Sequence, residues 1–352
     1  DVTNLAHYLY DDADVLVLGA GGGRDILSAL VFDQKKVVAV ELNQVIVDVI
    51  RKNFSTFTGN IALKPEVNLV LDEARSYLEA SKEKFDLVQA SLIDTWAATT
   101  SGAYALAENS IYTQEAWNTI LNRLSDRGVM SFSRWYVKEE PYELYRMVSL
   151  ARETLSYIGV KNCQSHIFAA SGNLWQGKSV VTILVSKKAF NQAQLDKLEQ
   201  ACKLNQFNIL ISPRNIADPV LSRLIHDNEI KREIEDQGRR VNIASPTDNC
   251  PYRLIVCLIL AVICSTIPLT VFKSHSGNMP SLRAFFIFAG AGAGFMLVEV
   301  ALLLKQSVYL GHPTISMATV LPTLLIASGA GSLFSARLGK YPEKSLFTKV
   351  LT

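Results

Sequence analysis

The N-terminal half of the chain alternates short apolar runs with segments of helical spacing. The runs that we predict to be buried strands are 14–18, 36–41, 67–71, 85–90 and 128–133. They are rich in apolar residues, as parallel strands are when both faces of their sheet are covered. Strands that alternate with helices in this way indicate an α/β domain around a mostly parallel sheet.

Two later strands complete the predicted domain. A strand at 180–185, with a weaker one at 163–168, would form an antiparallel edge. From 192 to 245 the pattern is polar and helical, with acids and bases interleaved, which is typical of a solvated helix face. We therefore expect a domain at 1–188 and a helical extension or linker at 189–250.

The hydrophobic pattern changes after residue 250. Three runs, 254–272, 284–304 and 315–335, contain at most one charged residue each. About twenty apolar residues span a bilayer, so the pattern predicts a membrane domain at 251–352 with three transmembrane helices. Buried helices of a soluble domain are the alternative. Glu299, the ionisable side chain of the second run, favours a hydrogen bond between helices, with a proton or cation path as the alternative.

A glycine cluster, Gly19-Ala20-Gly21-Gly22-Gly23, directly follows the first predicted strand and precedes a helix. Glycines permit a tight turn and close backbone approach to a nucleoside, and the free amides of the next helix point at the ligand. The spacing is G-x-G-x-G, because an arginine stands sixth. It favours the S-adenosylmethionine-dependent transferase fold, a Rossmann-like α/β fold, over the dinucleotide fingerprint G-x-G-x-x-G. A glycine turn without a ligand is the alternative.

Acids end or follow three of the predicted strands, at the edge where open α/β sheets bind ligands. Glu41, about twenty residues past the glycines, is placed for the ribose hydroxyls; an exposed acid at a strand end is the alternative. Asp72, with Glu73 and Ala74, is placed for an adenine ring, or else is a helix N-cap. Asp94 follows the fourth strand and should face the reactive end of the cofactor.

The segment 95–112 is long for a connection between a strand and a helix, and such connections tend to be lids or binding loops. Aromatic faces and an acid suit a cationic amine. The candidate substrate contacts in this segment are Trp96, Tyr104, Glu108 and Tyr112. Each of them alone is more often a packing residue.

Composition narrows the function classes. Hydrophobic residues make up 49% of the chain and charged ones 19%, with the apolar excess at the C-terminal end. The net charge of +2 gives no reason to expect a nucleic-acid partner. The five cysteines form no zinc-binding spacing. We expect reduced thiols facing a cytosol, and no metal.

The motifs together resemble a known family. They are GAGGGRD, VELN, DEARSYL, FDLVQASLIDTWAATTSGAYALAENSIYTQEAW and GAGFMLVEVALLLKQSVYLGHP. This series is similar to the membrane-integral spermidine synthase-like proteins of bacteria, over most of the chain. The earlier motifs are shared with polyamine aminopropyltransferases generally, and the last, at 292–313, is particular to the membrane-bound group.

The resemblance implies a cofactor and an acceptor. The cofactor would be decarboxylated S-adenosylmethionine or S-adenosylmethionine, lined by the glycines, with Glu41 at the ribose and Asp72 with Ala74 at the adenine. The acceptor would be a small-molecule amine or another nucleophile. It also implies a multi-pass protein of the bacterial inner membrane, in contact with lipid, with its catalytic domain in the cytoplasm. Oligomeric state stays open, a homo-oligomer included. Because the sequence starts at Asp1 rather than Met, we expect further residues before it.

One departure from the family pattern affects the reacting centre. Aminopropyltransferases carry the motif D-x-x-D-P after the fourth strand, and the second acid of the motif holds the amine. Asp94 matches the acid at the reacting centre, but Ala97 and Ala98 stand where the second acid and the proline would follow. The usual N-terminal β-hairpin is also not visible before Asp1.

Three functions remain from these observations. The first is a membrane-anchored transferase that moves an aminopropyl group to an amine, with Asp94 as general base. The second is an S-adenosylmethionine-dependent methyltransferase on a small or lipophilic acceptor, which the loss of the second acid favours. The third is a membrane transporter or sensor whose nucleoside domain only binds, with Glu299 as the working residue.

Overall fold

The computed structural model describes residues 1–93, 110–173, 178–216 and 218–226, and, nearer the C-terminus, 290, 292, 294–303, 306 and 313–338. The chain divides into two compact units. The first comprises 1–95 and 108–250, and the second 96–107 and 251–352. Each unit is described by itself below.

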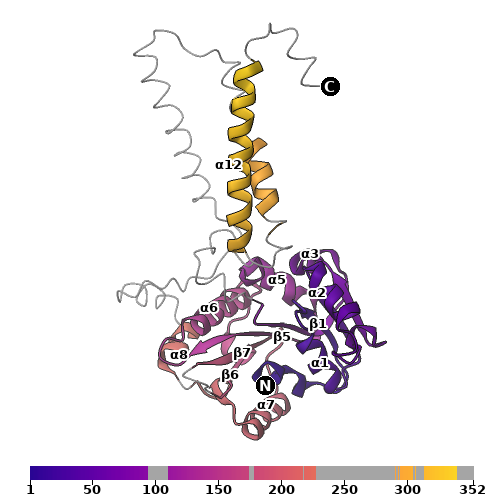
Figure 1. Cartoon of the computed structure of the whole chain (residues 1–352). Helices are drawn as coiled ribbons and strands as arrows, with labels where there is room; N and C mark the ends of the chain where they lie inside the picture. Colours follow the sequence, from indigo (N-terminus) through magenta and orange to yellow (C-terminus); the bar gives the residue numbers. More distant parts are fainter. Residues whose placement is uncertain are drawn as a thin grey trace, which may run out of the picture. The chain divides into compact units, whose positions relative to one another are not determined.

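A single mixed sheet forms the centre of the first unit, with the strand order β3-β2-β1-β4-β5-β7-β6-β8 (Figure 1). The strands are β1 Asp14–Leu18, β2 Lys36–Glu41, β3 Val67–Leu71, β4 Phe85–Ser91, β5 Leu124–Val137, β6 Ile167–Ser171, β7 Lys178–Ser186 and β8 Asn208–Ile211. Strands β1 to β5 are parallel, whereas β7 is antiparallel to both β5 and β6, and β8 is antiparallel to β6. The prediction of a Rossmann-like, mostly parallel sheet with an antiparallel edge is confirmed.

The predicted strand ends differ from the observed ones mainly at that edge. β5 is longer than predicted because it pairs with β7 as far as Val137. Residues 163–166 form a 3-10 turn, so β6 starts later than predicted. The helical prediction for 192–245 missed β8, a short strand whose burial increases from an exposed Asn208 to a buried Ile211. Its pairing with β6 overrides the weak local signal.

Helices cover both faces of the sheet. They are α1 Arg24–Val31, α2 Gln44–Asp48, α3 Ala74–Ala80, α5 Gln114–Arg123, α6 Tyr142–Tyr157, α7 Gln192–Asn205 and α8 Pro219–His226. Shorter helical turns are η1 Val2–Leu9, η2 Val49–Asn53, η3 Ile61–Leu63, η5 Ser110–Tyr112 and η6 Cys163–His166. Side chains of α3, α5, α6 and α8 belong to one hydrophobic core, and those of η1, α1, α2, η2 and α7 to a second.

Strand β1 shows why the sheet has a hydrophobic core on each face. Leu16 and Leu18 belong to the first core, and Val15 and Val17 to the second, because successive side chains of a strand point to opposite faces. All four are fully buried. The continuous apolar run in the sequence therefore reflects a strand covered on both sides.

Two of the cysteines lie within the described residues. Cys163 and Cys202 are buried and unbridged. Burial raises the pKa of the Cys202 thiol to about 12, and the nearby Glu199 carboxylate adds to this. This thiol is therefore unreactive at neutral pH.

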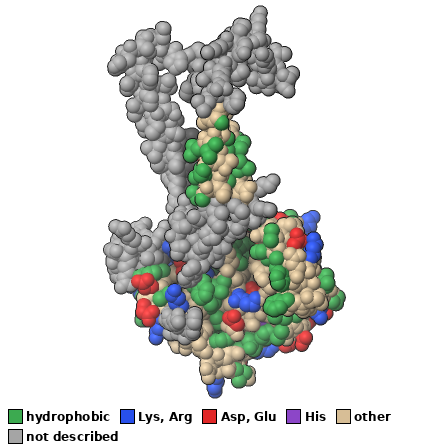
Figure 2. Space-filling view, viewed as in Figure 1, with side chains coloured by type: hydrophobic (Ala, Val, Ile, Leu, Met, Phe, Trp, Pro, Cys, Tyr) green, Lys and Arg blue, Asp and Glu red, His purple; other side chains and the backbone are tan. Residues whose placement is uncertain are grey.

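The second unit contains a helix at 294–303 and α12 Pro313–Leu338. Where their side chains are described they are mostly uncharged, and several large apolar ones are exposed; examples are Leu297, Leu325 and Ile326 (Figure 2). Among the described residues, no helix combines the length and the apolar character that a bilayer crossing requires. The predicted span 254–272 lies outside the described residues, and 284–304 is described only in part.

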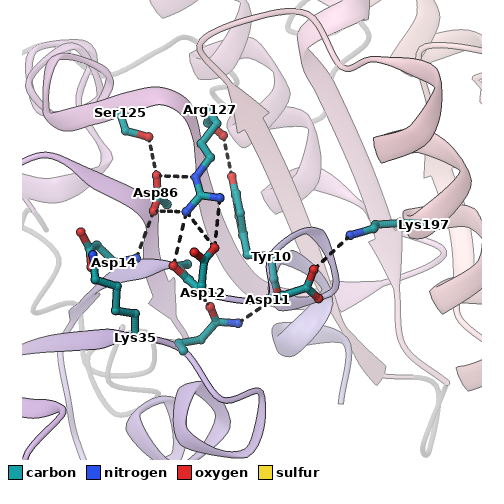
Figure 3. A network of polar contacts seen from close by, with 11 residues as sticks. Tyr10, Asp11, Asp12, Asp14, Lys35, Asp86, Ser125, Arg127 and Lys197 are labelled. Atoms are coloured by element: carbon teal, nitrogen blue, oxygen red, sulfur yellow. Dashed lines mark hydrogen bonds and ion pairs between the residues drawn. The ribbon is translucent and has the colours of Figure 1, made fainter.

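A network of polar side chains ties together the strand ends of the first unit that lie away from the glycine turn (Figure 3). Asp86 of β4 is almost buried and accepts two hydrogen bonds from the Arg127 guanidinium, at 3.0 and 2.8 Å. It also accepts the Ser125 hydroxyl at 2.6 Å and the Asp14 amide at 3.1 Å. Arg127 extends the network to Asp12.

Opposing effects determine the pKa of the Asp86 carboxyl. Burial raises the pKa of its carboxyl, but the hydrogen bonds from Arg127, Ser125 and the Asp14 amide together outweigh burial and hold that pKa below its usual range. The folded carboxyl therefore has a lower pKa than the unfolded one. Its contribution to stability is complete above the unfolded pKa and is lost as the pH falls through the folded pKa.

We predict that Asp86→Asn lowers the free energy of unfolding by about 2 kcal/mol at neutral pH, because the charge-assisted bonds to Arg127 are lost. The difference from the unchanged protein should shrink as the pH falls below ~4, where the carboxylate becomes protonated. Urea denaturation at several pH values measures both effects.

Asp126→Asn is the matched control, because Asp126 is highly exposed and pairs with Lys188 at the surface. It should change stability by less than about 0.5 kcal/mol. Equal effects of the two substitutions would contradict the role assigned to Asp86.

Candidate functional site

The glycine turn joins the end of β1 to the start of α1. Gly19, Gly21 and Gly23 have φ angles of 75°, 50° and 87°, in the left-handed region that favours glycine. The amides of Gly19 and Ala20 donate to the Val40 carbonyl of β2, at 2.9 and 3.0 Å. The turn is thereby fixed against the neighbouring strand.

At two of these positions an added side chain would require a neighbouring side chain to move. A Cβ atom at Gly19 would lie 2.6 Å from Ile93 Cγ2, and one at Gly23 would lie 2.3 Å from Ile61 Cδ1. At Gly22 a Cβ atom would meet nothing within 4 Å. The segment after β4 can therefore lie directly against the turn, because Gly19 has no side chain.

Glu41, at the end of β2, is buried and holds the backbone of this site together. Its Oε2 atom accepts the Gly21 amide at 2.9 Å, and its Oε1 atom accepts the Asn43 amide at 2.8 Å. It is not the exposed strand-end acid that was the alternative in the sequence. Each oxygen keeps a further lone pair for another donor. Its assignment to a ribose stays a prediction.

The tip of β3 lies beside that of β2, since the Asp72 amide donates to the Glu41 carbonyl at 3.1 Å. Glu73, not Asp72, is the N-cap of α3: its carboxylate accepts the Arg75 and Ser76 amides at 3.0 and 2.8 Å. Asp72 accepts only the Glu73 amide, at 2.7 Å, among the bonds described for its side chain. Ala74 is the first residue of α3.

Strand β4 ends at Ser91. Leu92 has a φ angle of 54°, and its amide donates to the Ser133 carbonyl of β5 at 3.0 Å. Asp94, Trp96, Tyr104 and Glu108 lie outside the described residues, so the structure places none of them.

Tyr112 is described and is buried in the first core. Its ring contacts the Phe132 ring edge-on, with centroids 5.7 Å apart, and the Arg134 guanidinium lies 4.5 Å from its centroid. Packing and a cation-π interaction are therefore enough to explain why an aromatic residue stands at this position. Its role as a substrate contact stays a prediction.

The sequence reasoning assigned no role to a buried carboxylate beside the turn. Asp25, in the first turn of α1, is 4% exposed and interacts with the hydroxyl of Ser91 at the tip of β4. The available signal was its position in GAGGGRD, where an acid opens an otherwise largely apolar helix. The structure supplies its partner, which comes from a strand far along the chain.

Two other features are not part of the glycine turn. A hollow of about 470 Å³ is lined by Glu79, Lys84, Thr119, Asn122, Arg123 and Lys187. Arg123 donates to the Leu78 and Glu79 carbonyls at the end of α3, and Lys84 donates to the Asn122 carbonyl. These cations thus cap helix ends. Glu299 lies in the helix 294–303 of the second unit and is half-exposed.

Comparison with known proteins finds similarity in the N-terminal part of the chain. Residues 2–163 match the family model of the spermine/spermidine synthase domain. A polyamine aminopropyltransferase of Korarchaeum cryptofilum is 24% identical over 140 residues, which are 40% of this chain and 41% of that protein. The matched region thus spans less than half the length of this curated relative. This part of the chain is similar to the spermine/spermidine synthase domain and to a polyamine aminopropyltransferase.

Solved structures are more distant. Spermidine synthase from Thermotoga maritima aligns with 64% of this chain and 72% of its own, at 16% identity and a TM-score of 0.42. Precorrin-6y C5,15-methyltransferase from Geobacter metallireducens aligns with 53% of this chain and 86% of its own, at 18% identity and a TM-score of 0.35.

We predict that Gly19→Ala destabilises the protein by about 1–2 kcal/mol, since a Cβ atom there must adopt positive φ and displace Ile93. Gly22→Ala, which meets open space, should cost at most about 0.5 kcal/mol. Thermal unfolding of both variants measures the difference. A Gly22→Ala variant as unstable as Gly19→Ala would show that the contact with Ile93 does not limit this turn.

Proposed function

We propose that the first unit transfers an aminopropyl group from decarboxylated S-adenosylmethionine to a small amine acceptor. The observation that carries the proposal is the match of residues 2–163 to the spermine/spermidine synthase domain. The geometry supports it, because the glycine turn, Glu41 and the tip of β4 meet at the carboxyl edge of the parallel strands.

The reaction is an in-line displacement at the carbon attached to a sulfonium. The bond from that carbon to sulfur breaks, its electron pair stays on the sulfur of methylthioadenosine, and the acceptor nitrogen forms the new bond. The cofactor carries its own leaving group, so the protein positions the two reactants and removes a proton from the amine.

Backbone groups and two carboxylates would hold the nucleoside in this proposal. The glycine turn gives close backbone approach, and Glu41 accepts the two ribose hydroxyls with the lone pairs that Gly21 and Asn43 leave free. Asp72 and Ala74 border the adenine; the hydrogen bond between Asp72 and Glu41 backbones supports this neighbourhood.

Asp94 would act at the reacting centre. It directly follows Ile93, which contacts the first glycine of the turn. The end of β4 at Ser91 also favours a second alignment of the D-x-x-D-P pattern. In that alignment Ser91 takes the place of the first acid, Asp94 that of the second and Thr95 that of the proline. Asp94 would then hold the amine rather than take its proton.

Methyl transfer from S-adenosylmethionine is the second candidate reaction. The hydroxyl of Ser91 at the tip of β4, where the second alignment expects a carboxylate, favours it. A methyl acceptor need not be a cation, so fewer acids are required at the reacting centre. The two reactions differ in the cofactor consumed and in the group found on the product.

We also propose that the segment from 251 to 352 anchors the protein in a lipid bilayer, with the first unit in the cytoplasm of a bacterium. The support is the charge-free run 254–272, together with the exposed apolar side chains of the described helices of the second unit.

We predict that Asp94→Asn lowers the turnover of aminopropyl transfer by about a hundred- to ten-thousandfold, because the amide cannot accept the proton. Cofactor affinity should change little. The assay follows labelled decarboxylated S-adenosylmethionine and labelled S-adenosylmethionine with a panel of diamines, polyamines and lipid extracts.

The assay separates the candidate roles. Weaker cofactor binding without a separate loss of turnover would contradict the general-base role and support the second alignment. Methyl transfer without aminopropyl transfer would replace the proposed reaction. Calorimetry that shows binding of NAD but of no adenosyl sulfonium compound or methylthioadenosine would overturn both reactions.

Membrane anchoring predicts that the full chain stays in the pellet when membranes are extracted with alkaline carbonate. A chain truncated after residue 250 is the matched comparison and should be released. Recovery of the full chain in the supernatant would contradict the proposed anchor.

A further inference from the structure

Three basic residues stand next to the ends of three neighbouring strands. Lys84 directly precedes β4, Arg123 directly precedes β5, and Lys187 directly follows β7. Because β4 and β5 are parallel and β7 is antiparallel to β5, the three residues lie at the same edge of the sheet. All three line the hollow of about 470 Å³ described above, which we call the basic hollow. Its volume is within the range of small-molecule sites.

Hydrogen bonds to backbone carbonyls hold two of these cations in place. Arg123 of α5 donates from Nε to the Leu78 carbonyl at 2.8 Å and from Nη2 to the Glu79 carbonyl at 3.1 Å. Both carbonyls belong to α3, which packs beside α5 (Figure 1). Lys84 Nζ donates to the Asn122 carbonyl. These bonds leave further N–H groups on both side chains, so two fixed charges keep donors for a ligand.

Helix capping does not account for the third cation. Lys187 is half-buried, and its side chain makes no hydrogen bond or ion pair with the residues that the structure describes. Its amide donates to the Gly128 carbonyl at 3.4 Å, which ties its backbone to β5. Among the described residues that line the basic hollow, Glu79 is the only acid, and Arg75 lies 3.3 Å from its carboxylate. Three cations thus face one carboxylate that already has a partner.

Such a lining favours an anion with several oxygen atoms. Charges of one sign in a hollow repel each other, and the low dielectric of its walls strengthens their attraction for a counter-ion. A phosphate group carries nearly two negative charges at neutral pH and has several acceptor oxygens. Arginine binds such a group through paired N–H donors, and lysine binds it as a point charge.

We propose that the basic hollow binds a small molecule through a phosphate group, with Lys84, Arg123 and Lys187 as its ligands. This site is distinct from the candidate cofactor site. Lys84 precedes β4 and Ser91 ends it, which is a separation of about 20 Å for a strand of seven residues. The inference therefore goes beyond the proposed function and does not depend on it.

The test is a calorimetric titration of the full chain, in a neutral detergent, with inorganic pyrophosphate at constant ionic strength. We expect saturable binding to the unchanged protein. Lys187→Gln should raise the Kd about tenfold, because it removes one charge-assisted contact with the anion. The variant should remain folded, since the substitution removes none of the described hydrogen bonds or ion pairs.

Lys188→Gln is the matched control. It removes the same charge one residue further along, where Lys188 pairs with the exposed Asp126 at 3.2 Å. Its Kd should stay within about twofold of the unchanged protein. Equal weakening by both substitutions would show a diffuse attraction to positive charge and overturn the inference. So would a Kd that Lys187→Gln leaves constant, or an unchanged protein that does not bind pyrophosphate saturably.

Methylthioadenosine separates the basic hollow from the candidate cofactor site. At saturation it should leave the Kd of pyrophosphate unchanged, whereas displacement of pyrophosphate would overturn the inference. A protein that binds pyrophosphate as expected but no adenosyl compound would contradict the proposed function and keep the inference. The same titration with phosphatidic acid in neutral micelles shows whether a lipid head group or a soluble phosphate compound binds more tightly, and Lys187→Gln should weaken either one.

Discussion

The close contact between the glycine turn and the segment after β4 is the constraint on which the site depends. A Cβ atom at Gly19 would lie only 2.6 Å from Ile93 Cγ2. Because this position has no side chain, two strand ends from distant parts of the sequence meet in one place. The turn is also fixed from the other side, where Glu41 accepts the Gly21 amide. The backbone of the glycine turn is therefore fixed from both sides.

Carboxylates near the two ends of the parallel strands differ in how many hydrogen-bond donors surround them. Asp86 at one edge is saturated with donors, and these hold its pKa below the usual range despite burial. Asp25 near the other edge has fewer donors, and burial raises its pKa. A fully compensated carboxylate stabilises the fold, whereas burying an undercompensated one costs free energy.

The residues at the end of β4 are those to compare with the D-x-x-D-P motif of aminopropyltransferases. Ser91 supplies a hydroxyl at the end of the strand, and Asp25 supplies a carboxylate to that hydroxyl from a different element. The acids of this site are therefore not all in one motif.

The sequence alone determined the central strands, because a run such as Val15 to Leu18 must be covered on both faces, and it located the glycine turn by spacing. It could not reveal β8, which forms by pairing with β6, nor that Glu73 rather than Asp72 caps α3. The interaction between Asp25 and Ser91 could not be predicted either, because the two residues are 66 positions apart in the sequence. Local patterns encode burial and turn geometry, whereas pairing between distant residues is decided only by the folded chain.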